Sequence, residues 1–155
     1  MSIATISRIG STSLETTLEL AGQVGRKMRG GEVIELISDL GGGKTTFVRG
    51  LARGMGSHDA VRSPSFTIGN QYRAGQLTLY HFDFYRLLEP GIMRNELAEY
   101  LADPKAIIVI EWGKIVEDVL PPERLTVSFK ALSADRRELT FSCPPKLDYL
   151  MPEDK

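Results

Sequence analysis

The sequence predicts an α/β protein whose central sheet is mostly parallel and carries added antiparallel strands, namely a hairpin and the C-terminal strands. A glycine-rich loop at 38–46 separates an apolar, strand-like run from a helical pattern, which is typical of parallel α/β folds. Residues 106–110 are all apolar, as in a strand covered on both faces. Alternating segments joined by Ala74-Gly75 predict an antiparallel hairpin at about 66–83. Helices on both faces of such a sheet give a three-layer sandwich.

The individual elements follow from residue periodicity and from turn residues. Isoleucines recur along 2–9, which favours an edge strand. Apolar residues recur at helical spacing from Leu14 to Met28, after a turn at 10–13 that supplies a helix cap. In chain order we expect strands or helices at 2–9 (strand), 14–28 (helix), 32–37 (strand), the end of the loop to about 55 (helix), 66–83 (hairpin), 93–101 (helix), and 106–110, 125–130 and 138–142 (strands).

Composition sets limits on the class of protein. The 155 residues suffice for one domain, placed at 1–145, followed by a polar, flexible tail at 146–155. No apolar run reaches the roughly 20 residues of a membrane span, and no signal-peptide pattern is present. Cys143 is the single cysteine and cannot form an internal disulfide, so we expect a cytoplasmic location. A net charge of −1 argues against a stand-alone nucleic-acid binder.

The loop from Ser38 to Thr46 is predicted to be a phosphate-binding P-loop. Its glycines let successive backbone N–H groups converge, and the start of the next helix adds a positive dipole end. Lys44 is expected to reach the β- and γ-phosphates, and the Thr45 hydroxyl to ligate Mg²⁺. Ser38 replaces the first glycine of the G-x-x-x-x-G-K-[ST] pattern, so a simple glycine-rich turn is the alternative. The expected nucleotide-binding residues of the loop are Asp39, Leu40, Gly41, Gly42, Gly43, Lys44, Thr45 and Thr46.

Two carboxylates are candidates for hydrolysis and metal binding. Glu111 follows the apolar run 106–110, and the carboxyl end of a buried parallel strand lies at the same sheet edge as the P-loop. Asp83 ends the second hairpin strand. Lys44, Asp83 and Glu111 are therefore the expected catalytic residues, and Thr45, Asp83 and Glu111 are the expected metal ligands. The alternatives are an ordinary ion pair for Glu111 and a turn cap for Asp83.

Other polar positions allow two interpretations each. Ser63-Pro64-Ser65 is a candidate switch segment that senses the γ-phosphate, or an ordinary proline turn. Arg86 is either a phosphate contact or the partner of Asp83. His81 fits a hydrogen-bonded core histidine better than a base. Trp112 is either part of the core or an exposed aromatic beside the nucleotide.

Four segments, in this order, resemble the TsaE family (formerly YjeE), bacterial ATPases of tRNA threonylcarbamoyladenosine biosynthesis. They are DLGGGKTT at 39–46, SPSFT at 63–67, YHFDFYRL at 80–87 and IEW at 110–112. The resemblance implies a P-loop α/β fold that binds and hydrolyses ATP with Mg²⁺ and associates with TsaD and TsaB. That assembly transfers a threonylcarbamoyl group, made by TsaC, to the adenosine next to the anticodon. ATP hydrolysis would reset the complex, and the chain would meet tRNA indirectly.

The resemblance also carries residue roles. Lys44, Thr45, Asp83, Glu111 and Trp112 match family positions for phosphate, metal, hydrolysis and nucleotide contacts.

A further position, Arg137, matches a nucleotide-contacting arginine of the family. The chain departs from the family pattern at Ser38, Gly42, Ser65 and Lys114. Of these, Ser38 bears on the backbone geometry at the entry to the loop, where the family has glycine. The alternative functions are a small P-loop kinase and a non-catalytic nucleotide-dependent switch. A GTPase is disfavoured because no Asn-Lys-x-Asp motif occurs.

Overall fold

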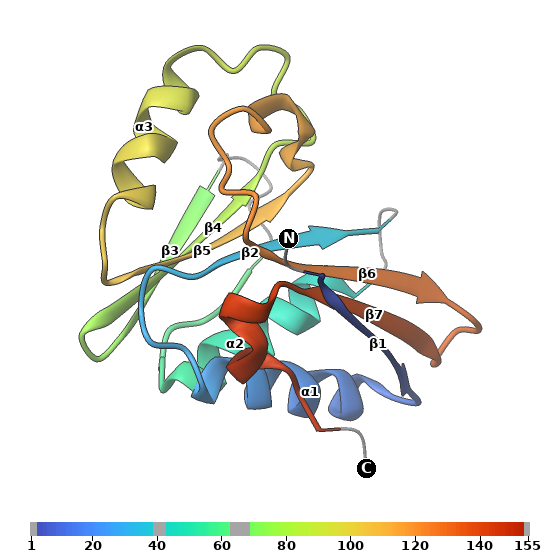
Figure 1. Cartoon of the computed structure of the whole chain (residues 1–155). Helices are drawn as coiled ribbons and strands as arrows, with labels where there is room; N and C mark the ends of the chain where they lie inside the picture. Colours follow the sequence, from blue (N-terminus) through green and yellow to red (C-terminus); the bar gives the residue numbers. More distant parts are fainter. Residues whose placement is uncertain (1–2, 39–42, 63–68, 154–155) are drawn as a thin grey trace.

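A computed structural model describes residues 3–38, 43–62 and 69–153 of the chain (Figure 1). The elements are, in order, β1 (Thr5–Ser11), α1 (Leu14–Arg26), β2 (Val33–Ile37), α2 (Lys44–Met55), β3 (Gly69–Ala74), β4 (Leu77–Asp83), α3 (Gly91–Leu101), β5 (Ala106–Glu111), the 3-10 helix η1 (Gly113–Val116), β6 (Leu125–Ala131), β7 (Arg137–Cys143) and the 3-10 helix η2 (Pro145–Leu150). Every helix and strand expected from the sequence is present, and the edge strand lies a few residues later than predicted.

The strands form one seven-stranded mixed sheet in the order β1-β7-β6-β2-β5-β4-β3. The four central strands, β6, β2, β5 and β4, pair in parallel. β3 extends the sheet antiparallel at one end, and β7 and β1 do so at the other. The predicted α/β class with a mostly parallel centre is confirmed. One detail differs from the expected antiparallel C-terminal strands: β7 is antiparallel to β6, but β6 itself pairs in parallel with β2.

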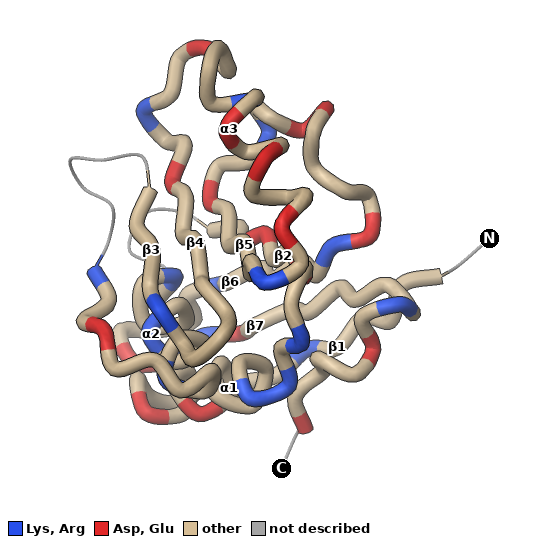
Figure 2. The backbone as a smooth tube through the Cα atoms, turned by 90° about the vertical axis from the view of Figure 1, so that its left-hand side faces the viewer, with Lys and Arg blue, Asp and Glu red and all other residues tan. Residues whose placement is uncertain are grey.

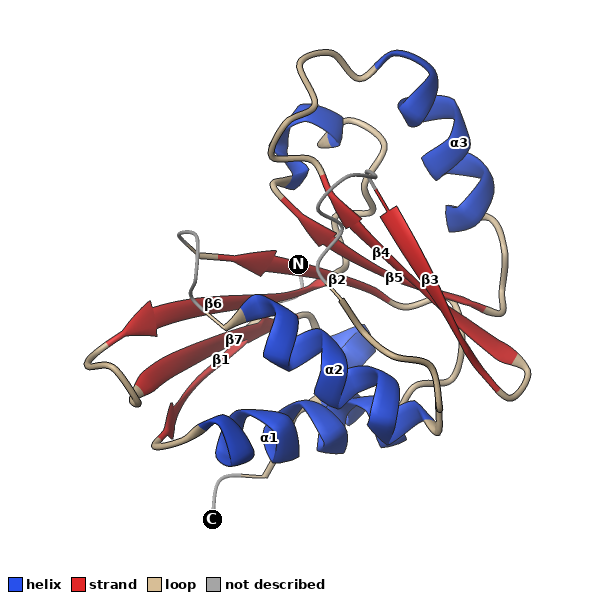
Figure 3. Ribbon diagram, turned by 180° about the vertical axis from the view of Figure 1, so that it is seen from behind, coloured by secondary structure: helices blue, strands red, loops and turns tan. Residues whose placement is uncertain are grey.

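Helices cover both faces of the sheet, as Figures 1 and 3 show. The side chains of β5 alternate between the two layers: Ile107 and Val109 belong to the core beneath α1 and α2, whereas Ile108 and Ile110 pack with Leu97 of α3. All six residues of β5 are buried. Burying an aliphatic side chain of this size contributes about 1.5–3 kcal/mol, so β5 anchors both layers. The arrangement is the three-layer sandwich that the sequence predicted.

α1 and α2 approach each other backbone to backbone. A Cβ placed on Gly50 would lie 2.6 Å from the Leu18 carbonyl oxygen, and one on Gly54 would collide with the Gly22 carbonyl. A Cβ on Gly25 would likewise collide with the Leu51 carbonyl. Glycine is therefore needed at positions 25, 50 and 54, since a side chain at any of them would separate the helices.

Part of the segment predicted as a flexible tail at 146–155 packs against the domain. Residues 145–150 form η2, whose Leu147 and Leu150 are buried in the core beneath α1. The Tyr149 hydroxyl donates to Glu32 at 2.6 Å, and the Lys27 ammonium donates to the Met151 carbonyl at 2.8 Å. The two buried leucines lie three residues apart, on one side of this short helix. The surrounding prolines and charged residues hide this apolar pair, so the stretch looks polar in the sequence.

Charges of both signs are spread over the molecule. Figure 2 shows lysine and arginine interspersed with aspartate and glutamate around α1 and α2 as well as around α3. This distribution agrees with the formal net charge of −1. In the described part of the chain, no helix is both long enough and apolar enough to cross a bilayer.

Candidate functional site

The site lies where the carboxyl ends of β2, β4 and β5 meet the start of α2. Gly43 caps α2 with a φ of 100°, a left-handed conformation that glycine adopts without strain. Its carbonyl accepts the first helical hydrogen bond, from the Phe47 N–H at 3.0 Å. Lys44 is the first residue of α2, and Thr45 and Thr46 follow it on the first turn, partly exposed. The other predicted loop residues, Asp39, Leu40, Gly41 and Gly42, lie outside the described residues, as does the candidate switch segment Ser63, Pro64 and Ser65.

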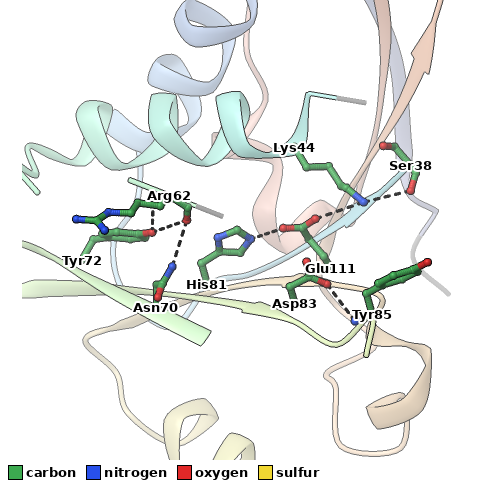
Figure 4. A network of polar contacts seen from close by, with 9 residues as sticks. All are labelled: Ser38, Lys44, Arg62, Asn70, Tyr72, His81, Asp83, Tyr85 and Glu111. Atoms are coloured by element: carbon green, nitrogen blue, oxygen red, sulfur yellow. Dashed lines mark hydrogen bonds and ion pairs between the residues drawn. The ribbon is translucent and has the colours of Figure 1, made fainter. Parts of the chain in front are cut away.

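Lys44 is a buried lysine whose ammonium group has two polar partners. The Nζ atom lies 3.3 Å from Oε1 of Glu111 and donates to the Ser38 carbonyl at 3.2 Å (Figure 4). It also lies 5.2 Å from the centre of the Trp112 ring, within cation–π range. A buried ammonium group requires such compensation. The structure thus places the loop lysine against the strand-end carboxylate.

Glu111, at the end of β5, is held from two sides. Its side chain is 5% exposed, and while Lys44 contacts Oε1, the imidazole Nε2 of His81 makes a close hydrogen bond to Oε2. Burial opposes ionisation, but the hydrogen bond and charge of His81 and the charge of Lys44 outweigh it, so the pKa of Glu111 lies below its ordinary value. The ion-pair alternative is therefore realised, and the partner is Lys44, the lysine of the predicted P-loop.

Asp83 is the register partner of Glu111 in the parallel pairing of β4 and β5. Its Oδ1 accepts a hydrogen bond from the Tyr85 N–H at 3.0 Å, so the turn-cap interpretation holds. Burial raises the pKa of Asp83, the Tyr85 N–H opposes this, and the charge of Glu111 adds to the increase. A carboxyl group with a raised pKa gains from a nearby cation, so the cap and a metal role are compatible.

The donors at this edge suit Mg²⁺. Thr45, Asp83 and Glu111 offer oxygen ligands, which this cation prefers, together with substrate phosphates and water. Within the described ranges, no group of three or more histidine, cysteine or acidic residues forms a metal cluster. Any Mg²⁺ here would depend on phosphate oxygens for much of its coordination, as is usual for this ion.

Trp112 lies beside Lys44 and is partly exposed. Its φ of 57° makes it the one non-glycine residue with a left-handed backbone in the described chain. The ring contacts that of Tyr85 with the centres 5.0 Å apart, and its exposed fraction is 41%. Of the two sequence interpretations, a place in the core is wrong, and the place beside a nucleotide stays a prediction. A hollow of about 320 Å³ is lined by Lys44, Trp112, Lys114, Arg124 and others.

Arg137 lies on the opposite side of the start of α2. Its guanidinium donates to the Ser133 carbonyl at 2.8 Å and the Ala134 carbonyl at 3.2 Å. It lines a hollow of about 200 Å³ that reaches the helix start, together with Ser13, Leu14, Thr17, Gly43, Thr46, Ala134 and Asp135. The sequence indicated Arg137 by resemblance alone, and no local pattern pointed to the residues around it.

Two further sequence hypotheses have outcomes here. His81 is a fully buried, hydrogen-bonded core histidine, as expected. Arg86 is exposed, and in the part of the chain that the structure describes it forms no ion pair with Asp83.

Comparison with known proteins identifies the family. The model of the family described as "Threonylcarbamoyl adenosine biosynthesis protein TsaE" matches residues 11–139. The chain belongs to the TsaE family. It is 43% identical to the TsaE protein of Bacillus subtilis over 112 residues, which is 72% of this chain and 70% of the relative. It is 38% identical to that of Treponema pallidum over 133 residues, 86% of this chain and 98% of the relative.

The fold agrees with a solved structure. The crystal structure of Bacillus subtilis YdiB superposes with a TM-score of 0.75 at 32% identity, covering 96% of this chain and 93% of the other. Membership of the TsaE family assigns the chain to tRNA threonylcarbamoyladenosine biosynthesis.

Proposed function

We propose that the chain binds ATP with Mg²⁺ and hydrolyses it to ADP and phosphate. Hydrolysis would act within the threonylcarbamoyladenosine machinery of the cytoplasm, resetting a complex with TsaD and TsaB, through which the chain meets tRNA. The observation that carries the proposal is the meeting of Lys44, Glu111 and Asp83 at the start of α2. One cation and two carboxyl groups at a helix N-terminus are the groups that phosphoryl transfer to water needs.

In this mechanism Lys44 exchanges partners. Its ammonium group leaves Glu111 and binds the β- and γ-phosphates, where the backbone N–H groups at the start of α2 add to the positive field. Glu111 then has one carboxylate oxygen free to orient the attacking water. Asp83, directly or through water, and the Thr45 hydroxyl would hold Mg²⁺. When bound, Mg²⁺ neutralises developing charge on the phosphates.

The remaining nucleotide contacts come from both sides of the loop. Arg137 and the hollow beside Gly43 and Thr46 would receive the nucleoside end. Trp112 would shield the phosphate end from water on the Lys44 side. Excluding water strengthens every charge interaction within the site.

A nucleotide-dependent switch without turnover is the second candidate. The observation in its favour is that both oxygens of Glu111 are engaged, one by His81 and one by Lys44. In that state Glu111 cannot activate water. The switch would differ from the ATPase in one respect, since nucleotide would bind and bring about partner association without phosphate release.

Calorimetry and phosphate release distinguish these functions. The ATPase proposal expects ATP binding that strengthens with Mg²⁺, and turnover that rises when TsaD and TsaB are added. Lys44→Ala should remove nucleotide binding, whereas Glu111→Ala should retain binding and lose turnover. Binding without turnover in the complete mixture would favour the switch, and no binding at all would refute both.

A further inference from the structure

His81 occupies a core position that an apolar residue would normally fill. Along one face of β4 it follows Leu79, and both side chains are fully buried beneath α2. Its Nδ1 atom has no hydrogen-bond partner among the described residues. Leaving a buried polar atom unpaired costs about 1–3 kcal/mol. A residue chosen for packing alone would avoid that cost, so the hydrogen bond that His81 makes among the described residues calls for a functional reason.

That bond fixes the orientation of Glu111. A carboxylate accepts hydrogen bonds and donates none, so the shared proton lies on Nε2 of His81. His81 comes from β4 and Glu111 from β5, two strands joined in parallel register with His81 opposite Val109. Both partners therefore lie on strands of the sheet, whereas Lys44 belongs to α2 and has a long, flexible side chain.

We infer that His81 is a positioning residue that holds Glu111 in its working rotamer after Lys44 has moved to the phosphates. The inference rests on the proposed ATPase function. With Lys44 on the nucleotide, His81 is the described contact that still holds the Glu111 carboxylate, binding Oε2 and leaving Oε1 toward the helix start (Figure 4). Without His81, the carboxylate would rotate and lose its alignment with the attacking water.

Three variants test this role by kinetics. His81→Leu keeps the volume and removes the donor, whereas His81→Gln keeps an N–H donor near the position of Nε2. His58, the other of the two histidines, is exposed, and His58→Gln is the matched control. With TsaD and TsaB present, His81→Leu should lower kcat about tenfold or more while KM for ATP stays within about twofold, as expected for a lost hydrogen bond to a charged group. His81→Gln should recover most of kcat.

A second measurement does not depend on turnover. Long-range ¹H–¹⁵N spectra of the imidazole rings distinguish the two tautomers, and the His58→Gln variant leaves His81 as the only source of signal. We expect a protonated Nε2, whose signal should shift in Glu111→Gln. The melting temperature of each variant shows whether it is folded.

The outcomes separate the inference from the proposed function. If wild type hydrolyses ATP and His81→Leu matches it in kcat, the inference is wrong and the ATPase proposal stands. An unprotonated Nε2, or equal losses in folded His81→Gln and His81→Leu, also overturns the inference. If wild type shows no turnover with its partners, the ATPase proposal fails, and the spectra still decide whether His81 binds Glu111 through Nε2.

Discussion

Asp83 and Glu111 are direct register partners on β4 and β5, so two carboxyl groups end neighbouring parallel strands at one edge of the sheet. Their environments shift their pKa values in opposite directions. Burial and the charge of Glu111 raise the pKa of Asp83, whereas His81 and Lys44 overcome the burial of Glu111 and lower its pKa. Paired carboxyl groups with opposite shifts are typical of sites where each has a different task.

Asp83→Asn is expected to stabilise the nucleotide-free protein slightly at neutral pH. A raised pKa means that ionising Asp83 is less favourable in the folded chain than in the unfolded chain, so the variant avoids a cost. The advantage should disappear as the pH falls below the ordinary aspartate value, where both forms are neutral. Urea unfolding at about pH 3 and about pH 7 measures the difference in free energy of unfolding.

The same variant should weaken Mg²⁺-dependent nucleotide binding. The affinity for ATP with Mg²⁺ should fall about tenfold or more, a loss typical of a perturbed metal shell, while the affinity without Mg²⁺ stays nearly unchanged. Equal losses with and without Mg²⁺ would contradict a metal role for Asp83.

Lys44 and Glu111 should be energetically coupled even without nucleotide. Because both side chains are almost fully buried, the Lys44→Met and Glu111→Gln pair should show a coupling energy of at least about 0.5 kcal/mol in a double-mutant cycle. The exposed pair Arg26 and Glu19 is the control, and its coupling should stay below about 0.5 kcal/mol. Additive effects at the buried pair would show that the contact contributes nothing.

Cys143 should resist alkylation in the folded protein. Burial raises the pKa of its thiol to about 11, with Asp148 adding to the shift, and the side chain is buried at the end of β7. Iodoacetamide at about pH 8 should label native protein far more slowly than urea-unfolded protein, because little thiolate is present or accessible. Rapid native labelling would contradict this burial.

The same thiol affects alkaline stability. A folded pKa above the unfolded value gives a contribution that is complete below about pH 9 and is lost as the pH rises through about 11. Cys143→Ala should therefore lose less stability than wild type across this window. The comparison is made by urea unfolding at each pH.

Gly54→Ala should destabilise the fold, whereas Gly22→Ala should not. A Cβ at Gly54 would collide with the backbone of α1, and overpacking of this kind costs about 1–3 kcal/mol. A Cβ at Gly22 meets its nearest atom, on the Arg26 side chain, at 3.4 Å, so the higher helix propensity of alanine should be neutral or stabilising by up to about 1 kcal/mol. Both positions belong to one helix contact, and thermal unfolding of the two variants compares them directly. Equal effects would contradict the close approach of α1 and α2.

Much of this architecture was predictable because its signals are local. The apolar run ending in Glu111 and the glycine-rich approach to Lys44 each carry their meaning in fewer than ten consecutive residues. The sheet edge that brings Glu111 and Asp83 together then follows from a general rule of parallel sheets.

The rest depends on contacts between distant segments. His81 and Glu111 are thirty residues apart, and nothing near either residue in the sequence marks the other. The hollow at Arg137 joins the start of α1 to the turn between β6 and β7. The docked η2 is also held by a hydrogen bond from Tyr149 to Glu32, more than a hundred residues away. Periodicity cannot report such pairings, because it describes one segment at a time.

The glycine contact between α1 and α2 restricts how the molecule can respond to its ligand. Since the two backbones touch at Gly50 and Gly54, neither helix has room to slide or roll against the other. The two helices are therefore expected to move as one rigid body, so that a displacement of the first turn of α2 also displaces α1. If nucleotide binding changes the conformation, we expect the change at the strand-end residues Asp83, Glu111 and Trp112 rather than between the two helices.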